Sequence, residues 1–386
     1  MIYMDNAATT MPKKEVVEAM MPYLTENYGN PSAIYQFANI SKAAIAKARK
    51  EVADLIHVRP ETIYFTSGGT ESDNWVLQEA FHNAIRNGIK EPHIITSRIE
   101  HHAILHTCQS LRELGCQVTM LPVDHNGLVD PRAVRDAIQE NTVLISIMAA
   151  NNEIGTIEPI TEIGEIAHGA GIPFHTDAVQ AFGQIPMDVS KMPIDYLSAS
   201  SHKIYGPKGV GFLYINEKQK TKALLHGGGQ ERNRRAGTEN VAGIVGFGKA
   251  CELAKNSLED RMQRESNLRD YMTNRLLKEI SDVHLNGDPI KRLPNNINLS
   301  FHGIEGESIL IMLDMRGICA SSGSACTAGS IDPSHVLIAT GLSPEEARES
   351  IRLTISDTTT KDEVDQVVDA LIEITGRLRE MSPLYS

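Results

Sequence analysis

The chain of 386 residues is longer than one hydrophobic core usually organises, so we expect two domains, one of them large. Hydrophobic residues make up 41% and charged residues 22% of the sequence, values that exclude a disordered or fibrous protein. The formal net charge of −12 disfavours a surface built for nucleic acid or anionic lipid, so small molecules or protein partners are expected.

Helical and strand-like segments alternate through the first two thirds of the sequence. Apolar residues recur with helical spacing at 41–56, and a β-branched, aromatic segment follows at 62–66. Further strands are predicted at 93–96, 117–121, 143–148, 173–176, 195–199 and 211–215. Intervening helices are predicted at 101–114, 131–139 and 161–170, and a long one from near residue 240 through 253. This order predicts an α/β fold with a mostly parallel sheet.

The last third of the chain predicts a smaller α+β domain. It begins with a helix from about residue 258, followed by a strand-like segment at 296–301 and, at its end, an amphipathic helix at 361–379. We expect the large domain to span residues 12–257 and the small domain to combine residues 1–11 and 258–386. Because no low-complexity linker separates them, the two domains should pack together.

The N-terminal residues lack a basic segment followed by an apolar core, and the sequence has no run of about 18 apolar residues, so we expect a cytoplasmic protein. Five cysteines without a CxxC pair fit neither a disulfide framework nor a zinc ribbon. Cys108, Cys116 and Cys251 lie in apolar helical contexts and are predicted to be buried. Cys319 is expected to be packed in a strand, and it is the one candidate for a second redox thiol.

A phosphate site is one of two interpretations of residues 65–72, FTSGGTES, where a strand ends and a helix begins. The free N–H groups and the dipole of a helix N-terminus favour an anion. A tight turn in which Thr70 and Asp73 form a capping box explains the segment about equally well. The rest of the sequence must decide between them.

A lysine and an aspartate favour the phosphate interpretation. Lys203 follows a strand rich in small hydroxyl residues, and Asp177 lies at the carboxyl end of another strand, where ligands of open α/β sheets gather. Alone, such a lysine is usually a solvated surface charge and such an aspartate a helix cap. Together, a lysine for a Schiff base, an acid for a pyridinium nitrogen and a phosphate-binding helix start are what pyridoxal phosphate requires.

Short motifs along nearly the whole chain resemble, in order, those of the NifS/IscS-type cysteine desulfurases, which belong to the class V aminotransferases. These motifs are DNAATT (5–10), GNPS (29–32), TSGGTES (66–72), EHH (100–102), NNEIG (151–155), HTDA (175–178), SHK (201–203), RAGT (235–238) and SSGSAC (321–326). The resemblance implies a fold-type-I pyridoxal-phosphate enzyme that forms a homodimer, with a large α/β/α domain that binds the cofactor and a smaller domain that carries a catalytic cysteine loop.

The resemblance also implies roles for individual residues. Lys203 corresponds to the Schiff-base lysine, Asp177 to the partner of the pyridinium nitrogen, His101 to the catalytic residue stacked on the ring and Gln180 to the partner of its phenolic oxygen. The implied phosphate contacts are Gly69, Thr70, Ser200, His202 and Thr238, the last from the neighbouring subunit.

Asn152 and Arg352 correspond to the clamp on the substrate carboxylate, and Asn152 also lies among the implied cofactor contacts. The planar fork of an arginine suits a carboxylate, although a surface salt bridge is the commoner role of this residue type.

Cys326 is the expected sulfur acceptor. It lies in a run of small residues, SSGSACTAGS, without apolar periodicity, which predicts an exposed loop. A thiolate there could attack the sulfur of cofactor-bound cysteine and carry it away as a persulfide. His102 and His106 have the i, i+4 spacing of metal ligands, but no third type of ligand clusters with them, so no metal is expected.

The predicted function is conversion of L-cysteine to L-alanine, with sulfur passing to Cys326 and on to an acceptor in iron–sulfur cluster assembly or tRNA thiolation. Two alternatives stay open. One is another pyridoxal enzyme on the same fold, such as a selenocysteine lyase or a small-amino-acid aminotransferase. The other is a catalytically silent scaffold that binds iron–sulfur assembly proteins. Cys326 disfavours an aminotransferase, and intact Lys203 and Asp177 disfavour a scaffold.

Overall fold

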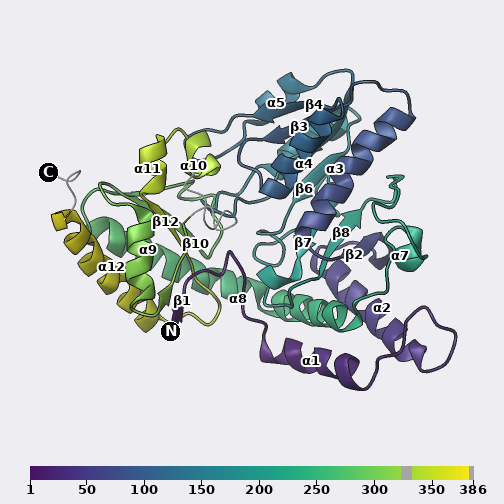
Figure 1. The fold of residues 1–386 in the computed structure, drawn as a ribbon, viewed down its shortest axis with the longest axis horizontal. Coiled ribbons are helices and arrows are strands. Elements are labelled where there is room, and N and C mark those ends of the chain that lie inside the picture. Colours follow the sequence, from purple (N-terminus) through teal and green to yellow (C-terminus); the bar gives the residue numbers. More distant parts are fainter. Residues whose placement is uncertain (323–332, 382–386) are drawn as a thin grey trace.

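The computed structural model describes residues 1–322 and 333–381 of the chain (Figure 1). Cys326 lies outside the described residues. In the described part, two bodies of secondary structure lie side by side, and a long helix, α8 (Val241–Glu279), runs from one into the other. None of the described helices has the length and apolar character needed to cross a membrane.

The larger body is built on a sheet of seven strands within the described residues, in the order β2-β8-β7-β6-β5-β3-β4. These strands are β2 (Ile63–Thr66), β3 (His93–Ser97), β4 (Gln117–Leu121), β5 (Thr142–Ser146), β6 (Phe174–Asp177), β7 (Tyr196–Ser200) and β8 (Gly211–Ile215). The run from β7 to β4 is parallel, whereas β8 pairs antiparallel with β7 and β2. The prediction of a mostly parallel sheet is therefore confirmed.

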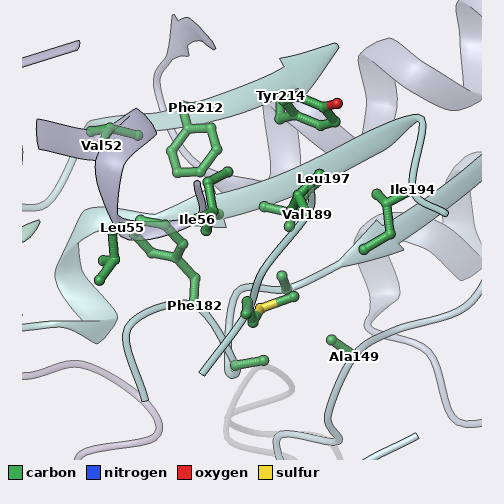
Figure 2. Close-up of a cluster of buried hydrophobic side chains, with 14 of the residues drawn as sticks. Val52, Leu55, Ile56, Ala149, Phe182, Val189, Ile194, Leu197, Phe212 and Tyr214 are labelled. Atoms are coloured by element: carbon green, nitrogen blue, oxygen red, sulfur yellow. The ribbon is translucent and has the colours of Figure 1, made fainter. Parts of the chain in front are cut away.

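Helices cover both faces of this sheet. They are α1 (Lys14–Thr25), α2 (Ala38–Leu55), α3 (Gly69–Arg86), α4 (His102–Glu113), α5 (Pro131–Ala137), α6 (Ile160–Gly169), α7 (Gln230–Asn233) and the first part of α8, with 3₁₀ turns at Pro60–Thr62 and Ser201–Lys203. Neighbouring strand residues point to opposite faces, so Leu144 packs in the layer of α3 and α4 while Ile145 packs in the layer of α2 and α8. Figure 2 shows the second layer, where Val52 and Leu55 of α2 lie near Phe182 and Phe212.

The smaller body has a three-stranded antiparallel sheet, β12-β10-β9, and a two-stranded parallel ladder of β1 with β11. Its strands are β1 (Ile2–Tyr3), β9 (Val283–Leu285), β10 (Asn296–Phe301), β11 (Ile318–Cys319) and β12 (Ser350–Thr354). Its helices are α9 (Gly306–Asp314), α10 (His335–Ala339), α11 (Pro344–Arg348) and α12 (Lys361–Met381). Met4 is fully buried in the core of this body, so the N-terminal residues join it from the far end of the sequence.

The predicted domain boundary at 257 and 258 falls inside α8. Residues up to Ala254 pack in the core of the large body, whereas Met272 and Leu276 pack in the core of the small one. Helix was predicted through 253 and again from about 258, and the structure joins the two segments in one helix that ends at 279. Its middle is polar and contains no Gly or Pro, so nothing in the local sequence stops it. The domain limits themselves remain a prediction.

Candidate active site

A cavity of about 390 Å³ opens where the carboxyl ends of the parallel strands meet the small body. Such ends share one edge of the sheet, which is where open α/β proteins place their ligands. The wall is formed by Ala7, Ala8, Gly69, Thr70, Asp73, His101, His102, Met148, Ala150, Asn152, Glu153, Asp177, Val179, Gln180, Ser200, His202, Lys203, His335 and Arg352. Among the described residues, it therefore collects every site residue predicted from the sequence except Thr238.

Lys203 lies on the 3₁₀ turn Ser201–Lys203, directly after β7. Its Nζ donates to the carbonyl oxygens of Ala7 at 2.6 Å and Ala8 at 2.7 Å. The interpretation of this lysine as a solvated surface charge is wrong. Its side chain lines the cavity and is hydrogen-bonded to the N-terminal segment. Gln180 donates to the same Ala7 carbonyl at 3.0 Å.

Asp177 ends β6 and is 5% exposed. One carboxylate oxygen accepts the backbone N–H of Val179 at 2.9 Å. Burial raises the pKa of Asp177 to about 6, and the positive charge of Lys203 acts in the opposite direction. The carboxylate is thus ready to face a cation at neutral pH.

The start of α3 forms the third side of the cavity. Gly68 is its N-cap residue and has no side chain that could cap the helix, so the capping-box interpretation of Thr70 and Asp73 is wrong. A Cβ on Gly69 would meet Val179 Cγ2 at 2.5 Å, so the glycine keeps this part of the wall open. Helix N–H groups lie here beside Thr70, Ser200 and His202, an arrangement that suits a phosphate.

His101 is the N-cap of α4, and its Nδ1 accepts the N–H of Ala103 at 3.1 Å. This bond leaves the proton of the neutral ring on Nε2. The pKa of His101 is lowered to about 4, mainly by burial and then by Lys203. His202, whose ring lies 3.1 Å from the Thr9 hydroxyl, also has its pKa lowered to about 4 by burial.

Arg352 projects from β12 of the small body and is 2% exposed. It forms an ion pair with Asp5 at 2.8 Å and donates to the carbonyl of Asn152 at 2.9 Å. Its Nε finds no hydrogen-bond partner in the described part of the chain. A buried guanidinium that lines the cavity with an unused donor fits an anionic ligand better than a surface salt bridge.

Thr238 lies apart from this cavity, in a recess of about 70 Å³ that it shares with Glu231 and Arg235. The resemblance assigned it to the neighbouring subunit's site, and that assignment remains a prediction.

Other wall residues carried no predicted role, above all Asp73 and His335. Asp73 shares the buried face of α3 with Gly69 and Val76, so helical spacing could have placed it toward the sheet. His335 begins α10, and its ring contacts that of His102 at 4.8 Å between centroids. No described group of three or more His, Cys, Asp or Glu side chains could hold a metal ion.

Four cysteines belong to the described residues. Cys108, Cys116 and Cys251 are buried, which confirms their prediction, and Cys319 is partly buried. Burial raises the pKa of Cys108 to about 12 and that of Cys116 to about 11, and it raises the pKa of Cys251 well above its usual value. These three thiols are poor nucleophiles at neutral pH.

Comparison with known proteins identifies the family. The model of the aminotransferase class-V family matches residues 2–367. The chain belongs to the aminotransferase class-V family. It is 56% identical over 383 residues to a cysteine desulfurase IscS of Methanosarcina thermophila, with 99% of this chain and 94% of that protein covered. It is 51% identical over 386 residues to a cysteine desulfurase IscS of Clostridium botulinum strain Hall, with 100% and 96% covered.

Two solved structures share the fold of this chain. A NifS-like protein superposes with a TM-score of 0.91 at 37% identity, covering 98% of this chain and 100% of that one. A structure described as SspA in complex with cysteine superposes with a TM-score of 0.83, also at 37% identity, covering 93% and 100%. The fold predicted from the sequence, that of the fold-type-I pyridoxal-phosphate enzymes, is therefore confirmed.

Class-V aminotransferases use pyridoxal phosphate, and the cavity fits it. The N-terminus of α3, kept clear by Gly69, suits the phosphate of that cofactor. The buried carboxylate of Asp177 suits its pyridinium nitrogen, and the primary amine of Lys203 suits its aldehyde.

Proposed function

We propose that this protein is a pyridoxal-phosphate-dependent cysteine desulfurase, which converts L-cysteine to L-alanine and transfers the sulfur to its own Cys326. The observation that carries the proposal is the single cavity that brings Lys203, Asp177, the start of α3 and Arg352 together. The full-length similarity to cysteine desulfurases supplies the substrate.

The cofactor would be held at four points of this cavity. Gly69, Thr70, Ser200 and His202 would bind its phosphate, and Lys203 would bind it covalently. Asp177 would face its pyridinium nitrogen, while Gln180 would bond its phenolic oxygen. When bound, pyridoxal phosphate supplies an electron sink that allows bonds at the α- and β-carbons of an amino acid to break.

Arg352 would orient the substrate. Its guanidinium is fixed by Asp5 and the carbonyl of Asn152, so little side-chain freedom is lost when the substrate carboxylate binds. Because β12 belongs to the small body and Lys203 to the large one, the substrate would be held between the two. His101, with its proton on Nε2, would serve as the proton donor within the cavity.

Cys326 would carry out the sulfur transfer, an assignment that rests on the sequence motif alone. Its thiolate attacks the substrate sulfur, so that a sulfur–sulfur bond forms. The bond between Cβ and sulfur breaks, its electron pair stays with the carbon side, and protonation there yields alanine. Cys108, Cys116 and Cys251 are poor competitors because they are buried with raised pKa values.

A homodimer would complete the cavity, since Thr238 reaches no part of the cavity in its own chain. A separate acceptor protein would take the persulfide sulfur toward iron–sulfur clusters or tRNA thiolation. A cytoplasmic location remains the expectation from the sequence.

The test is to load the purified protein with pyridoxal phosphate, add L-cysteine and a thiol reductant, and quantify alanine and sulfide. Equal yields are expected. Cys326→Ser should keep the bound cofactor and lose both products, whereas Cys319→Ser should keep both.

A loaded protein that releases neither product from cysteine would contradict the desulfurase assignment and favour another amino-acid substrate. A protein that never retains the cofactor would favour the scaffold alternative. Selenocysteine, supplied in parallel, distinguishes a lyase specific for selenium.

A further inference from the structure

Three carboxyl groups lie buried together beneath the cavity, and the proposed function uses only one of them. Asp73 is 1% exposed, Glu100 is 0% exposed and Asp177 is 5% exposed. Asp177 interacts electrostatically with both of the others. Burial this deep penalises each negative charge, and each charge disfavours the next.

The surroundings of Asp73 and Asp177 differ. Asp177 has the backbone N–H of Val179 and the positive charge of Lys203. The charges of Asp177 and Glu100 disfavour ionisation of Asp73, whereas a hydrogen bond with the Ser198 hydroxyl acts in the opposite direction and is outweighed by burial. Its Oδ1 has no hydrogen-bond partner among the described residues, which is costly for an ionised carboxylate.

His175 is the nearest candidate for a cation beside Asp73, with its Nε2 3.6 Å from Asp73 Oδ1. Its two ring nitrogens lie 2.8 Å from the Ser146 hydroxyl and 3.0 Å from the Ser198 hydroxyl. The ring is 0% exposed, and burial lowers the pKa of His175 to about 3. It is therefore neutral and does not compensate a charge on Asp73.

Glu100 is also held without a cation. Its Oε1 accepts the Ser97 hydroxyl at 2.7 Å and the Met148 N–H at 3.0 Å, whereas its Oε2 has no partner within residues 1–322 and 333–381. Burial raises the pKa of Glu100 to about 8. Of the three acids, only Asp177 faces a positive charge.

We propose that Asp73 is a positioning residue held as the neutral acid, so that the single negative charge of this cluster stays on Asp177, opposite Lys203 and the pyridinium nitrogen of the cofactor. A charged Asp73 would compete for that role and disfavour ionisation of Asp177. The protonated carboxyl instead offers an O–H to its surroundings, with the Ser198 hydroxyl within reach. Burial likewise raises the pKa of Asp73 well above its usual value.

The first experiment measures the protonation state without cofactor. The infrared difference spectrum of apoprotein minus Asp73→Asn should show, near neutral pH, the carbonyl band of a protonated carboxylic acid. Loss of carboxylate bands instead would overturn the proposal. Glu79→Gln is the matched control on the same helix, because Glu79 forms an ion pair with Arg86 at 2.6 Å. The difference spectrum of this control should show the bands of an ionised carboxylate. If Asp73→Asn fails to fold, Asp73→Ser tests the same band.

The second experiment uses the protein loaded with pyridoxal phosphate and follows its visible absorbance against pH. Asp73→Asn should keep the midpoint within about 0.3 pH unit, because a neutral amide replaces a neutral acid. A fall of about one unit or more would reveal that a negative charge had been removed from beside Asp177, and would contradict the proposal. Asp73→Ala should weaken cofactor binding about tenfold, whereas Asp73→Asn should not. Equal losses of cofactor affinity in the two variants would also contradict the proposal.

Neither experiment measures sulfur. A protein that binds the cofactor but leaves cysteine intact would refute the proposed function and leave the assignment of Asp73 standing.

Discussion

Burial sets the charge of the side chains that surround the cavity. Desolvation keeps His101 and His202 neutral, and the pKa of Asp177 is raised only to about 6 because the N–H of Val179 and the positive charge of Lys203 oppose the effect of burial. The cavity therefore combines the amine of Lys203, the carboxylate of Asp177 and these two neutral imidazoles with the guanidinium of Arg352. That distribution suits a cofactor with a cationic ring nitrogen and an anionic phosphate.

Replacing Lys203 tests whether its amine anchors the cofactor in the cavity. Lys203→Ala, loaded with pyridoxal phosphate and then desalted, should lose the visible absorbance of the bound cofactor, because its covalent anchor is gone. Lys208→Ala is the matched control, since Lys208 is exposed on the same segment. An unchanged spectrum in Lys203→Ala would refute the assignment.

Glu158, which does not line the cavity, tests how burial makes the free energy of unfolding depend on pH. It is 3% exposed, and burial raises the pKa of its carboxyl from 4.5 to about 8. The folded state therefore keeps a proton that the unfolded state has lost. The contribution of this group to the free energy of unfolding is fully present below about pH 4.5 and falls by a few kcal/mol as the pH rises toward about 8.

Glu158→Gln should remove that dependence, because the amide is neutral at every pH. Its melting temperature relative to wild type should rise between about pH 5 and about pH 8. Glu165→Gln, at an exposed position of α6, should show no such trend. A constant difference across this range for Glu158→Gln would contradict the raised pKa.

At single residues, the sequence predicted which side chains serve the cavity better than it predicted which of them carry a charge. Lys203, Asp177 and Arg352 could be named because their residue types stand in recognisable motifs. For Asp73 the sequence offered only a cap, as one of two interpretations of its segment, because a capping box and a buried helix face place an acid at the same spacing. Distinguishing them requires the position of α3 over the sheet, which is a tertiary feature.

Among the elements, α8 connects the two bodies. Its 39 residues span about 58 Å, long enough to contribute to both cores. Near its middle, Arg261 is 4% exposed and Glu265 is 0% exposed, with 4.0 Å between the nearest nitrogen and oxygen. Arg261 also donates to the carbonyl of Gly183, so this pair lies where α8 leaves the large core.

Arg261→Met should lower the free energy of unfolding by about 3 kcal/mol or more, because it leaves Glu265 buried without its partner. Arg261→Met with Glu265→Leu should lose less than the single change. Chemical denaturation measures both, with Lys255→Met, an exposed position one and a half turns earlier, as the control expected to cost at most about 1 kcal/mol. A double variant less stable than the single one would contradict this account.

The elements that were predicted well are those whose pattern is local. The strands of the large sheet were placed correctly because each is a short segment between turns, and all of them except β7 contain β-branched residues. The continuity of α8 was not predicted, because its polar middle loses the apolar periodicity that marks a helix, so helix was expected only through 253 and again from about 258. Residues 231–233 also have positive φ angles of 45°, 58° and 63°, and the ion pair of Glu231 with Arg49 beside them joins parts of the chain far apart in sequence.

For the whole molecule, the exposed apolar side chains of residues 11–40 support the proposed homodimer. Tyr28 is 78% exposed, Ile34 103% and Tyr35 51%, in the segment that follows α1 at the edge of the large body (Figure 1). Large apolar groups gathered on one surface are typical of a protein interface. This surface, together with Thr238 outside its own chain's cavity, supports a homodimer.

Light scattering after size exclusion should therefore give the mass of a dimer. Ile34→Asp combined with Tyr28→Asp should shift the protein toward monomer and weaken cofactor binding. Met315→Asp is the control, since Met315 is 82% exposed at the end of α9 in the small body and should not affect assembly. A wild-type monomer that retains full cofactor binding would contradict the dimer.

Cysteine sulfur is proposed to pass to Cys326 in a cavity built around Lys203. A single turnover of the loaded protein with L-cysteine in the absence of reductant, followed by mass spectrometry of the peptide that carries Cys326, tests this transfer. The proposed transfer leaves one additional sulfur atom on Cys326 for each alanine formed. Alanine formed while Cys326 stays unmodified, or sulfur found on Cys319 instead, would contradict it.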